Sequence, residues 1–374
     1  MTGDGPSPMA TDSLNDVAVA AGDPQDMAAA IAGLGRQFEE GWAAAWPQAA
    51  AAELPVQGAA AYTAAVICGM GGSAIGGDIA VACLPDLAVP LAVVRGYEPP
   101  AWVGPRTLLL GVSHSGGTEE TLACVRTAAR RGCVPVCVTM GGELAATTAR
   151  HGWPLLRVPG GLMPRAALGF LTTAVLAVLE RAGLAEGAEA QVAETAELLC
   201  VMAEELGPQV PEERNRAKQL ARAFAGRLPF VYGMGPTTPA ARRWKCQLNE
   251  NAKHPCAWAE LPEADHNDVA VWDGRQALLD ELAIVVLADA DRRLSRRLQA
   301  TVDLLASRCG HVTVIPSRGR SPLARCCSAL YVGDWTSLYL SVLNGTNPTP
   351  IPAIDALKAA RSPAVLAAPT SDGG

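Results

Sequence analysis

Short apolar runs recur along the first half of the chain, and longer stretches with apolar positions at helical spacing lie between them. Such runs are typical of strands buried on both faces of a parallel sheet, and the intervening stretches are long enough for helices. The predicted strands lie at residues 64–69, 90–95, 106–112, 133–139 and 154–158. This alternation predicts a parallel sheet covered by helices.

The same pattern returns in the second half. The segment 230–238, FVYGMGPTT, repeats the plan of 66–74, VICGMGGSA, with an apolar strand, Gly-Met-Gly and a small hydroxyl residue. Strand-like runs at 282–289, 311–317 and 329–334 follow in the order of the first half, which indicates a duplicated domain. The sequence therefore predicts an α/β protein of two subdomains. Each is a mostly parallel β-sheet flanked by helices, in a flavodoxin-like or Rossmann-like topology.

Boundaries between the predicted units follow from composition and from prolines. The first residues are rich in Gly, Pro, Ser and Asp, which is typical of disorder, and apolar positions at helical spacing begin at Met27. Pro208 and Pro211 interrupt two long helical stretches, so we place the domain boundary there. The predicted units are a disordered tail (1–25), an N-terminal helix (26–55), a first subdomain (56–207), a second subdomain (208–360) and a loose C-terminal tail (361–374).

Composition and charge narrow the classes of partner. The chain has 374 residues, of which 49% are hydrophobic and 18% charged, and this suits two packed domains. Its net charge of −7 provides no basic field for nucleic acid or an anionic membrane surface, so we expect neither as a partner. An anionic substrate must then be held locally by backbone amides and a few placed cations.

Targeting signals and cysteines indicate the cellular compartment of the protein. The first 25 residues carry four aspartates and lack the apolar core of a secretory signal, and the sequence contains no apolar run of membrane-spanning length. We therefore expect a cytoplasmic protein whose 11 cysteines are reduced thiols. Because the sequence has no CxxC pair, a structural zinc site is not expected.

The first candidate loop is GMGGSAIGGD, residues 69–78, which follows an apolar strand and precedes a helical pattern. Its glycines let the backbone approach an anion, and Ser73 adds a hydroxyl. Gly69-x-Gly71-x-x-Ala74 also satisfies the dinucleotide-binding fingerprint. The next strand, however, ends at Arg95 where that fingerprint calls for an acidic residue near the ribose. An ordinary tight turn is the third interpretation.

The second candidate loop, SHSGGTEET at 113–121, favours a phosphate group. Ser113, Ser115 and Thr118 place three hydroxyls around two glycines, and Glu119 and Glu120 suit the first turn of the following helix. Hydroxyls and loop amides satisfy the oxygens of a monophosphate, whereas a dinucleotide fold has no need of this loop. A serine-rich helix cap is the alternative without a ligand.

These two loops together resemble the sugar isomerase (SIS) domain. Gly-Met-Gly-Gly-Ser followed by Ser-x-Ser-Gly-x-Thr-x-Glu-Thr is its pattern, and residues 60 to 360 are similar to one branch, the bifunctional phosphoglucose/phosphomannose isomerases of archaea and bacteria. The resemblance implies two SIS domains, a homodimer and no cofactor. It implies isomerisation of glucose 6-phosphate or mannose 6-phosphate to fructose 6-phosphate through a cis-enediol.

The resemblance also assigns site residues. It implies that Arg165 and Lys358 assist the chemistry, that Glu250 is the base, and that His266 reaches the site from the partner subunit. The residues implied to bind substrate and phosphate are Gly71, Gly72, Ser73, Ser113, Ser115 and Thr118. Two positions depart from the family pattern, with His114 in place of an aromatic such as Tyr and Gly117 in place of Asn.

The chemistry of these residue types suits the reaction. A carboxylate such as Glu250 can move a proton between C1 and C2, His266 titrates near neutral pH and can serve the ring oxygen, and Arg165 can stabilise an enediolate. Each also has a structural alternative. These are a solvated helix face for Glu250, a surface loop for His266, a salt bridge for Arg165 and an exposed helix position for Lys358.

Two further functions stay open on the sequence. A non-catalytic SIS sensor of sugar phosphates predicts loss of the acid–base residues, and the presence of Glu250 and His266 speaks against it. A nucleotide-dependent dehydrogenase using residues 69–74 predicts that Ser113 and Ser115 are dispensable. A metal site at His254, Cys256 and His266 matches no zinc spacing.

Overall fold

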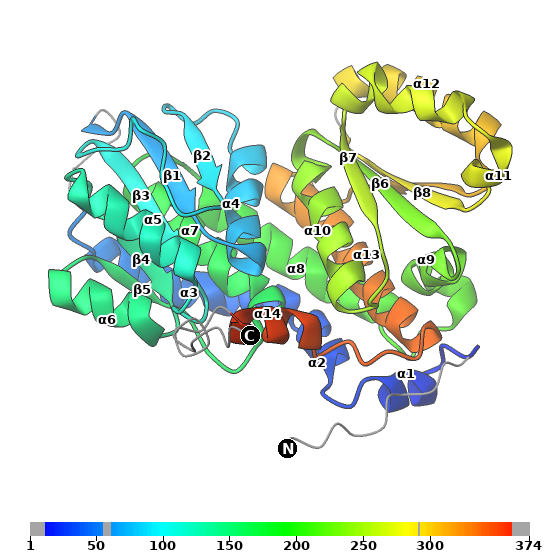
Figure 1. Ribbon diagram of the computed structural model, residues 1–374, viewed down its shortest axis with the longest axis horizontal. Helices are drawn as coiled ribbons and strands as arrows, with labels where there is room; N and C mark the ends of the chain where they lie inside the picture. Colours follow the sequence, from blue (N-terminus) through cyan, green and yellow to red (C-terminus); the bar gives the residue numbers. More distant parts are fainter. Residues whose placement is uncertain (1–11, 55–60, 291, 361–374) are drawn as a thin grey trace, which may run out of the picture.

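The computed structural model describes residues 12–54, 61–290 and 292–360. Two parallel sheets lie side by side, each with its own helices, and further helices pack between and across them (Figure 1). The chain is therefore the two-subdomain α/β protein that the sequence predicts. The C-terminal tail predicted at 361–374 lies outside the described residues.

The first sheet contains all five strands predicted for the first half, in the spatial order β2-β1-β3-β4-β5, and every pair is parallel. Alternate residues face opposite sides, because Ala65 and Ile67 belong to one apolar core while Val66 and Cys68 belong to another. The strands are β1 (Ala64–Cys68), β2 (Leu91–Val94), β3 (Thr107–Val112), β4 (Val136–Thr139) and β5 (Leu155–Arg157).

Helices cover both faces of this sheet. On one face, α4 (Gly71–Cys83) and α7 (Leu168–Arg181) contribute to the core that contains Ile67, and α3 (Leu34–Ala51) packs against α7. On the other face, α5 (Glu119–Arg130) and α6 (Gly142–His151) bury Val125 and Leu144 against Val66. The helix pattern of the first half thus buries both sides of the strands, as continuous apolar runs require.

The second sheet repeats the plan of the first with one strand fewer. It has the order β7-β6-β8-β9, again parallel throughout. The strands are β6 (Leu228–Met234), β7 (Ala257–Leu261), β8 (Leu282–Ala288) and β9 (Val312–Pro316). Because β7 and β6 correspond to β2 and β1, the equal strand order supports the duplication inferred from the sequence.

The strand predicted at 329–334 is wrong, because these residues lie inside α13 (Pro322–Leu343). This helix is buried on nearly all sides, so its apolar residues form a continuous run without an exposed stripe. A short apolar run of this kind does not distinguish a buried strand from a buried helix. The strand β7 was not predicted, since its sequence AWAEL contains a glutamate and four of its five residues are incompletely buried.

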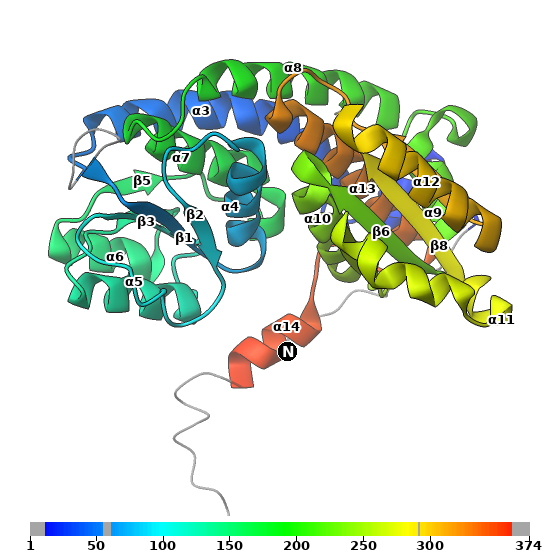
Figure 2. The ribbon, with the colours of Figure 1, turned by 90° about the horizontal axis from the view of Figure 1, so that it is seen from above.

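Helices α8 (Ala188–Leu206) and α3 lie against one another along one side of both sheets, and α14 (Pro352–Ala360) projects from the other side (Figure 2). One apolar core runs from the first sheet through this helical layer to the second. The remaining helices of the second half are α9 (Arg216–Phe224), α10 (Thr238–Glu250), α11 (Gln276–Leu279) and α12 (Arg292–Arg308). Single 3-10 turns occur at 164–166, 212–214, 235–237, 263–266 and 268–273.

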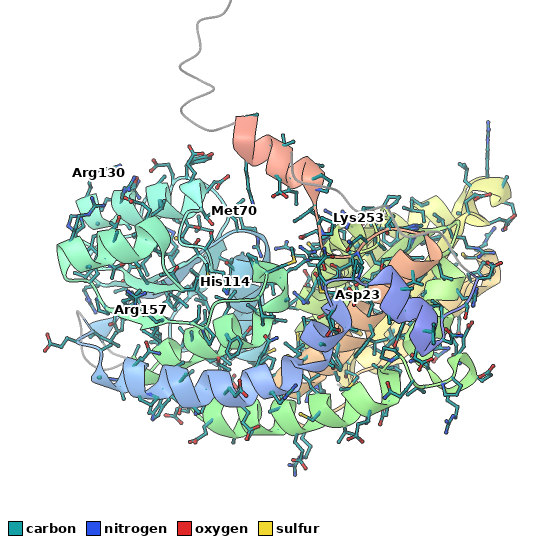
Figure 3. The ribbon with its side chains drawn as sticks, turned by 90° about the horizontal axis from the view of Figure 1, so that it is seen from below. Asp23, Met70, His114, Arg130, Arg157 and Lys253 are labelled. Carbon is teal, nitrogen blue, oxygen red and sulfur yellow. The ribbon has the colours of Figure 1, made fainter. Side chains whose placement is uncertain are left out.

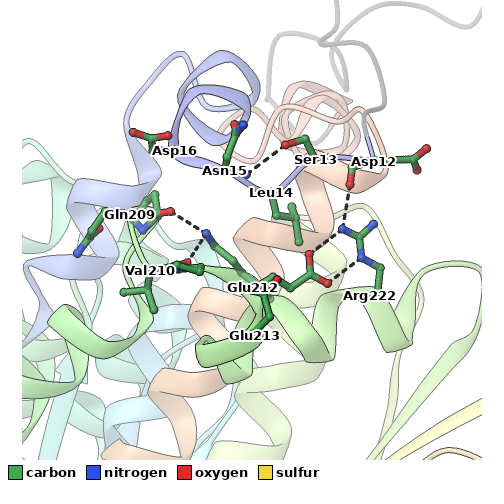
Figure 4. A pocket seen from close by; sticks show the side chains of 13 residues that line it. Asp12, Ser13, Leu14, Asn15, Asp16, Gln209, Val210, Glu212, Glu213 and Arg222 are labelled. Atoms are coloured by element: carbon green, nitrogen blue, oxygen red, sulfur yellow. Dashed lines mark hydrogen bonds and ion pairs between the residues drawn. The ribbon is translucent and has the colours of Figure 1, made fainter.

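The N-terminal segment differs from the predicted tail and single helix. Residues 1–11 lie outside the described residues, but α1 (Asp16–Gly22) buries Val19 and packs against α13. The helix predicted at 26–55 is divided at Gly33 into α2 (Met27–Ala32) and α3. Figure 4 shows how the segment is tied down, since Arg222 of α9 donates to the Asp12 carbonyl and to Glu212. A few buried apolar side chains thus order a polar segment.

A buried ion pair joins α10 to α13 where the second subdomain, here called the second lobe, meets the first subdomain, the first lobe. Arg243 donates to both carboxylate oxygens of Asp334 at 2.7–3.2 Å, and both side chains are at most 5% exposed. The same guanidinium donates to the carbonyl of Arg165 at 2.9 Å. The pair therefore supports the 3-10 turn that carries a predicted site residue.

All 11 cysteines are free thiols. In the ranges that the structure describes, the helices are too short or too polar to cross a membrane.

Candidate active site

The two glycine- and serine-rich loops meet because they follow neighbouring parallel strands. The loop after β1 leads into α4 at Gly71, and the loop after β3 leads into α5 at Glu119. The Oγ atom of Ser73 accepts a hydrogen bond from the backbone N–H of His114 at 3.2 Å. The predicted substrate-binding and phosphate-binding segments therefore form one surface at the carboxyl edge of the first sheet, where parallel α/β folds bind ligands.

Hydroxyls and amides of the second loop bond to one another. Ser113 Oγ lies 2.8 Å from Thr118 Oγ1 and accepts from the Gly116 N–H at 3.1 Å, while Ser115 Oγ accepts from the Gly117 N–H at 3.3 Å. Ser113 is buried and Ser115 is exposed. Thr118 precedes α5, and its side chain does not cap the start of this helix. Helix N-termini are a type of site that binds anions.

Gly116 fixes the shape of this loop. Its φ of +70° lies in the left-handed region, and a Cβ there would lie 1.9 Å from the Gly141 carbonyl oxygen. The Leu144 N–H donates to the Gly116 carbonyl, so the start of α6 holds the loop at this glycine. The loop is therefore built to a fixed shape before any ligand binds.

Arg165 connects this edge to the second lobe. It lies in the 3-10 turn after β5 and is 4% exposed. Its Nε donates to Asn251 Oδ1 at 2.9 Å, and its Nη2 donates to the carbonyls of Pro348 and Thr349 at 2.8 and 2.7 Å. Its Nη1 lies 3.5 Å from Glu250 Oε2. Three hydrogen bonds thus hold the guanidinium, and the remaining nitrogen faces the carboxylate.

Close packing places the Arg165–Glu250 pair beside the first loop. A Cβ on Gly72 would lie 2.8 Å from the Pro164 carbonyl oxygen, so α4 begins in direct contact with the turn that carries Arg165. Glu250 is the last residue of α10, and its side chain is 25% exposed. Figure 3 shows Met70 and His114 on the side of the first lobe that faces Lys253, three residues after Glu250. The structure therefore brings Gly72, Ser73, Arg165 and Glu250 together.

Lys253 and Asn251 belong to this cluster and were not identified from the sequence. Lys253 has a φ of +50°, and its Nζ donates to the carbonyls of Glu250 and Asn347 at 2.8 and 2.7 Å. Burial and the positive charge of Arg165 lower the pKa of Lys253 to about 8. The only sequence signal is their place directly after Glu250 in NENAK.

His266 lies apart from Glu250 within one chain, and Lys358 lies on a separate helix. The residue His266 is exposed and follows β7, so it lies at the carboxyl edge of the second sheet. Helix α10 starts at that edge and runs back over about 20 Å, which places Glu250 at the amino edge. Lys358 is exposed on α14, which projects from the body of the chain (Figure 2).

The two departures from the family pattern have different structural roles. The residue His114 is buried, its Nε2 lies 3.2 Å from the Pro159 carbonyl, and burial lowers the pKa of its imidazole. It therefore ties the second loop, residues 113–121, to the segment after β5. For Gly117, a Cβ would meet no atom of the described chain within 4 Å, so a larger side chain fits there.

Arg95 and His254, considered from the sequence for a dinucleotide site and a metal site, bond to other parts of the chain. The guanidinium of Arg95 bonds to Asp78, which also pairs with Arg242 of the second lobe, so Arg95 supports the interface between lobes. A ring nitrogen of His254 lies 2.7 Å from the Arg227 carbonyl. Among the described residues, no three side chains of His, Cys, Asp or Glu cluster as metal ligands do.

Comparison with known proteins gives a consistent set of relatives. Residues 213–360 match the bacterial phospho-glucose isomerase C-terminal SIS domain. A bifunctional phosphoglucose/phosphomannose isomerase of Caldicellulosiruptor bescii is 39% identical over 78% of this chain and 88% of its own length. One of Aquifex aeolicus is 31% identical over 79% and 90%. A glucose-6-phosphate isomerase like protein of Thermus thermophilus shares the fold, with a TM-score of 0.60, 20% identity and coverage of 90% and 98%.

Proposed function

Since the chain belongs to the family of bifunctional phosphoglucose/phosphomannose isomerases, we propose that it interconverts aldose and ketose hexose 6-phosphates. Glucose 6-phosphate and mannose 6-phosphate are the aldoses and fructose 6-phosphate is the ketose. The observation that carries this assignment is the Glu250 carboxylate beside the held guanidinium of Arg165, next to a loop shaped for phosphate. We place the reaction in the cytoplasm, because 11 free thiols suit a reducing compartment.

The phosphate group binds at Ser113, Ser115 and Thr118, and the sugar extends across Gly71, Gly72 and Ser73 toward Glu250. After the ring opens, the Glu250 carboxylate takes the proton from C2 of the aldose, and the electron pair of that bond forms the enediolate. The Nη1 group of Arg165 stabilises its negative oxygen. The Glu250 carboxyl exchanges its proton with water in a share of the turnovers and then protonates C1, while the hydroxyl proton moves from O2 to O1, and the ketose results.

A coupled assay tests this function. Formation of fructose 6-phosphate is followed from glucose 6-phosphate and from mannose 6-phosphate in parallel, with EDTA present. Turnover of both sugars supports a dual-specificity isomerase that needs no added metal. Turnover of neither contradicts the proposal and favours a sensor of sugar phosphates.

We propose further that two copies of the chain complete each site. His266 is exposed and lies at the opposite edge of the second sheet from Glu250 of its own chain, so a homodimer is the arrangement in which it serves Glu250 of the partner. In this arrangement His266 exchanges the proton of the ring oxygen, and Lys358 assists ring opening. The alternative is that both are solvated surface residues.

Mixed dimers test the shared site. Glu250→Gln and His266→Asn are each expected to be nearly inactive, but their co-expression places one doubly altered site and one intact site in each mixed dimer. We expect activity to return to roughly a quarter of the wild-type level in the mixed population. Activity that stays at the level of the single variants contradicts the shared site. Co-expression of each variant with itself is the control.

Gly116→Ala is expected to raise KM for glucose 6-phosphate by on the order of tenfold or more, because the added Cβ displaces the loop from Gly141 and removes loop–phosphate hydrogen bonds. Gly117→Ala is the matched control, since it adds the same methyl group into open space one residue away. Steady-state kinetics and thermal unfolding of both variants check the result. Equal KM values would show that the loop does not hold the phosphate.

The alkaline side of the pH profile is expected to depend on Lys253. Its charged form ties the end of α10 and the 347–349 segment together, and this charge is lost as pH rises through its pKa of about 8. We therefore expect kcat to fall above that pH. Lys253→Arg keeps the charge and should move the decline to higher pH. Lys245→Arg on α10 is the control, and an unmoved decline in Lys253→Arg would refute this role.

A further inference from the structure

A cavity lies far from the phosphate-binding loop. It measures about 520 Å³ and opens between the carboxyl-terminal ends of α5 and α6. Cys133 and Val134 precede β4, and Trp153 precedes β5, so the cavity lies at the amino edge of the first sheet. Figure 3 places Arg130 of this cavity on the outer side of the first lobe, away from Lys253. Its volume is in the range of small-ligand sites.

Positive charge gathers in this cavity. Arg126, Arg130 and Arg150 line it, together with His151. Arg126 and Arg150 both pair with the same oxygen, Oε1 of Glu143, at 2.9 and 3.0 Å. One negative charge thus pairs with two positive charges.

Arg130 adds a cation that is not neutralised. Its Nη2 donates to Thr127 Oγ1 at 2.8 Å, and in the described chain no carboxylate lies within ion-pair distance of it. The nearby Glu98 pairs instead with Arg131. The cavity therefore keeps about two positive charges in excess, from three arginines against one carboxylate, on a chain whose net charge is −7.

An aromatic stack stands beside these arginines. The rings of His151 and Trp153 lie 4.6 Å apart at an angle of 13°, and the residue His151 is exposed. A planar base can extend such a stack, and guanidinium groups bind phosphate oxygens with two parallel hydrogen bonds. The two features are within one cavity, which distinguishes it from a dispersed basic surface.

The cavity between α1 and α9 has no excess of positive charge (Figure 4). Its two cations, Lys218 and Arg222, are already bonded to backbone carbonyls and to Glu212, and acidic residues surround them. That cavity has no spare positive charge for an anion. The comparison supports the cavity of α5 and α6 as the anion-binding one.

We propose that this cavity is a nucleotide site, in which Arg126, Arg130 and Arg150 bind the phosphates and the base stacks on His151. The site is separate from the phosphate-binding loop and stands whether or not the isomerase assignment holds. The ligand class is a nucleoside with two or more phosphate groups, because several cations face one aromatic stack.

Titration calorimetry of the full chain with ATP tests the site. We expect binding that weakens on the order of tenfold or more in Arg130→Gln/Arg150→Gln, and no change in Arg214→Gln/Arg216→Gln, which removes the same charge from the exposed surface. The variant His151→Ala should weaken ATP about fivefold or more while leaving inorganic triphosphate unaffected.

Three results would overturn the proposal. They are no binding of ATP, binding that survives Arg130→Gln/Arg150→Gln, and binding that is lost in Ser115→Ala/Thr118→Ala, which would place ATP at the phosphate-binding loop. Inorganic triphosphate that binds as tightly as ATP would overturn the role of the aromatic stack. Because Arg130, Arg150, His151 and Ser115 are exposed and Thr118 is only partly buried, the variants are expected to fold.

Discussion

Glu250→Gln is expected to lower kcat for glucose 6-phosphate by about 10²–10⁴-fold, with KM close to its wild-type value. The amide has the shape of the carboxylate but cannot accept the C2 proton. The groups proposed to hold the phosphate, Ser113, Ser115 and Thr118, lie on another loop and are unchanged. Steady-state kinetics with both aldoses measures the two constants.

The fold of this variant is expected to be preserved, because the Glu250 side chain is partly exposed and its ion pair with Arg165, at 3.5 Å, is long. Glu204→Gln, an exposed position on α8, is the matched control and should keep wild-type kinetics. If Glu250→Gln keeps normal turnover, another group is the base. If KM rises and kcat is unchanged, Glu250 binds substrate and does not carry the proton.

Arg243→Met is expected to lower the free energy of unfolding by about 3–5 kcal/mol. It leaves Asp334 as a buried carboxylate without its partner, and uncompensated buried charges have costs of this size. Activity should fall as well, because the Arg165 carbonyl loses its donor. Urea unfolding gives the stability, and kinetics below the unfolding transition gives the activity.

An exposed pair provides the control. Arg318→Met breaks the ion pair with Glu205, whose side chains are 42% and 47% exposed, and should change stability by less than about 1 kcal/mol. The double variant Arg243→Met/Asp334→Leu removes both charges and should regain most of the stability but not the activity. Equal effects of Arg243→Met and Arg318→Met would contradict the importance of the buried pair.

The first sheet could be predicted from the sequence because each of its strands is a short apolar run between helices. The second sheet was predicted less well for physical reasons. Helix α13 is buried along its length, so residues 329–334 carry no exposed stripe to reveal a helical period. Strand β7 is an edge strand with Glu260 in it, so it lacks the continuous apolar pattern of a central strand.

The two loops of the candidate site could also be predicted from the sequence, because glycines and hydroxyls directly after strands occupy the carboxyl edge of a parallel sheet. The contact between Arg165 and Glu250 depends on tertiary packing across 85 positions of the chain, and no local pattern encodes it. Lys253 was missed because a single lysine near a helix end is usually a solvated side chain. One of its carbonyl partners comes from the distant 347 position.

Exchange with solvent deuterium tests proton transfer by Glu250 most directly. Glucose 6-phosphate is equilibrated with the enzyme in D₂O, and the C2 proton is followed by NMR. Wild-type enzyme is expected to replace this proton by deuterium, while Glu250→Gln binds the sugar and leaves the proton in place. Retention of the C2 proton by active wild-type enzyme, or normal exchange by Glu250→Gln, would contradict proton transfer through Glu250.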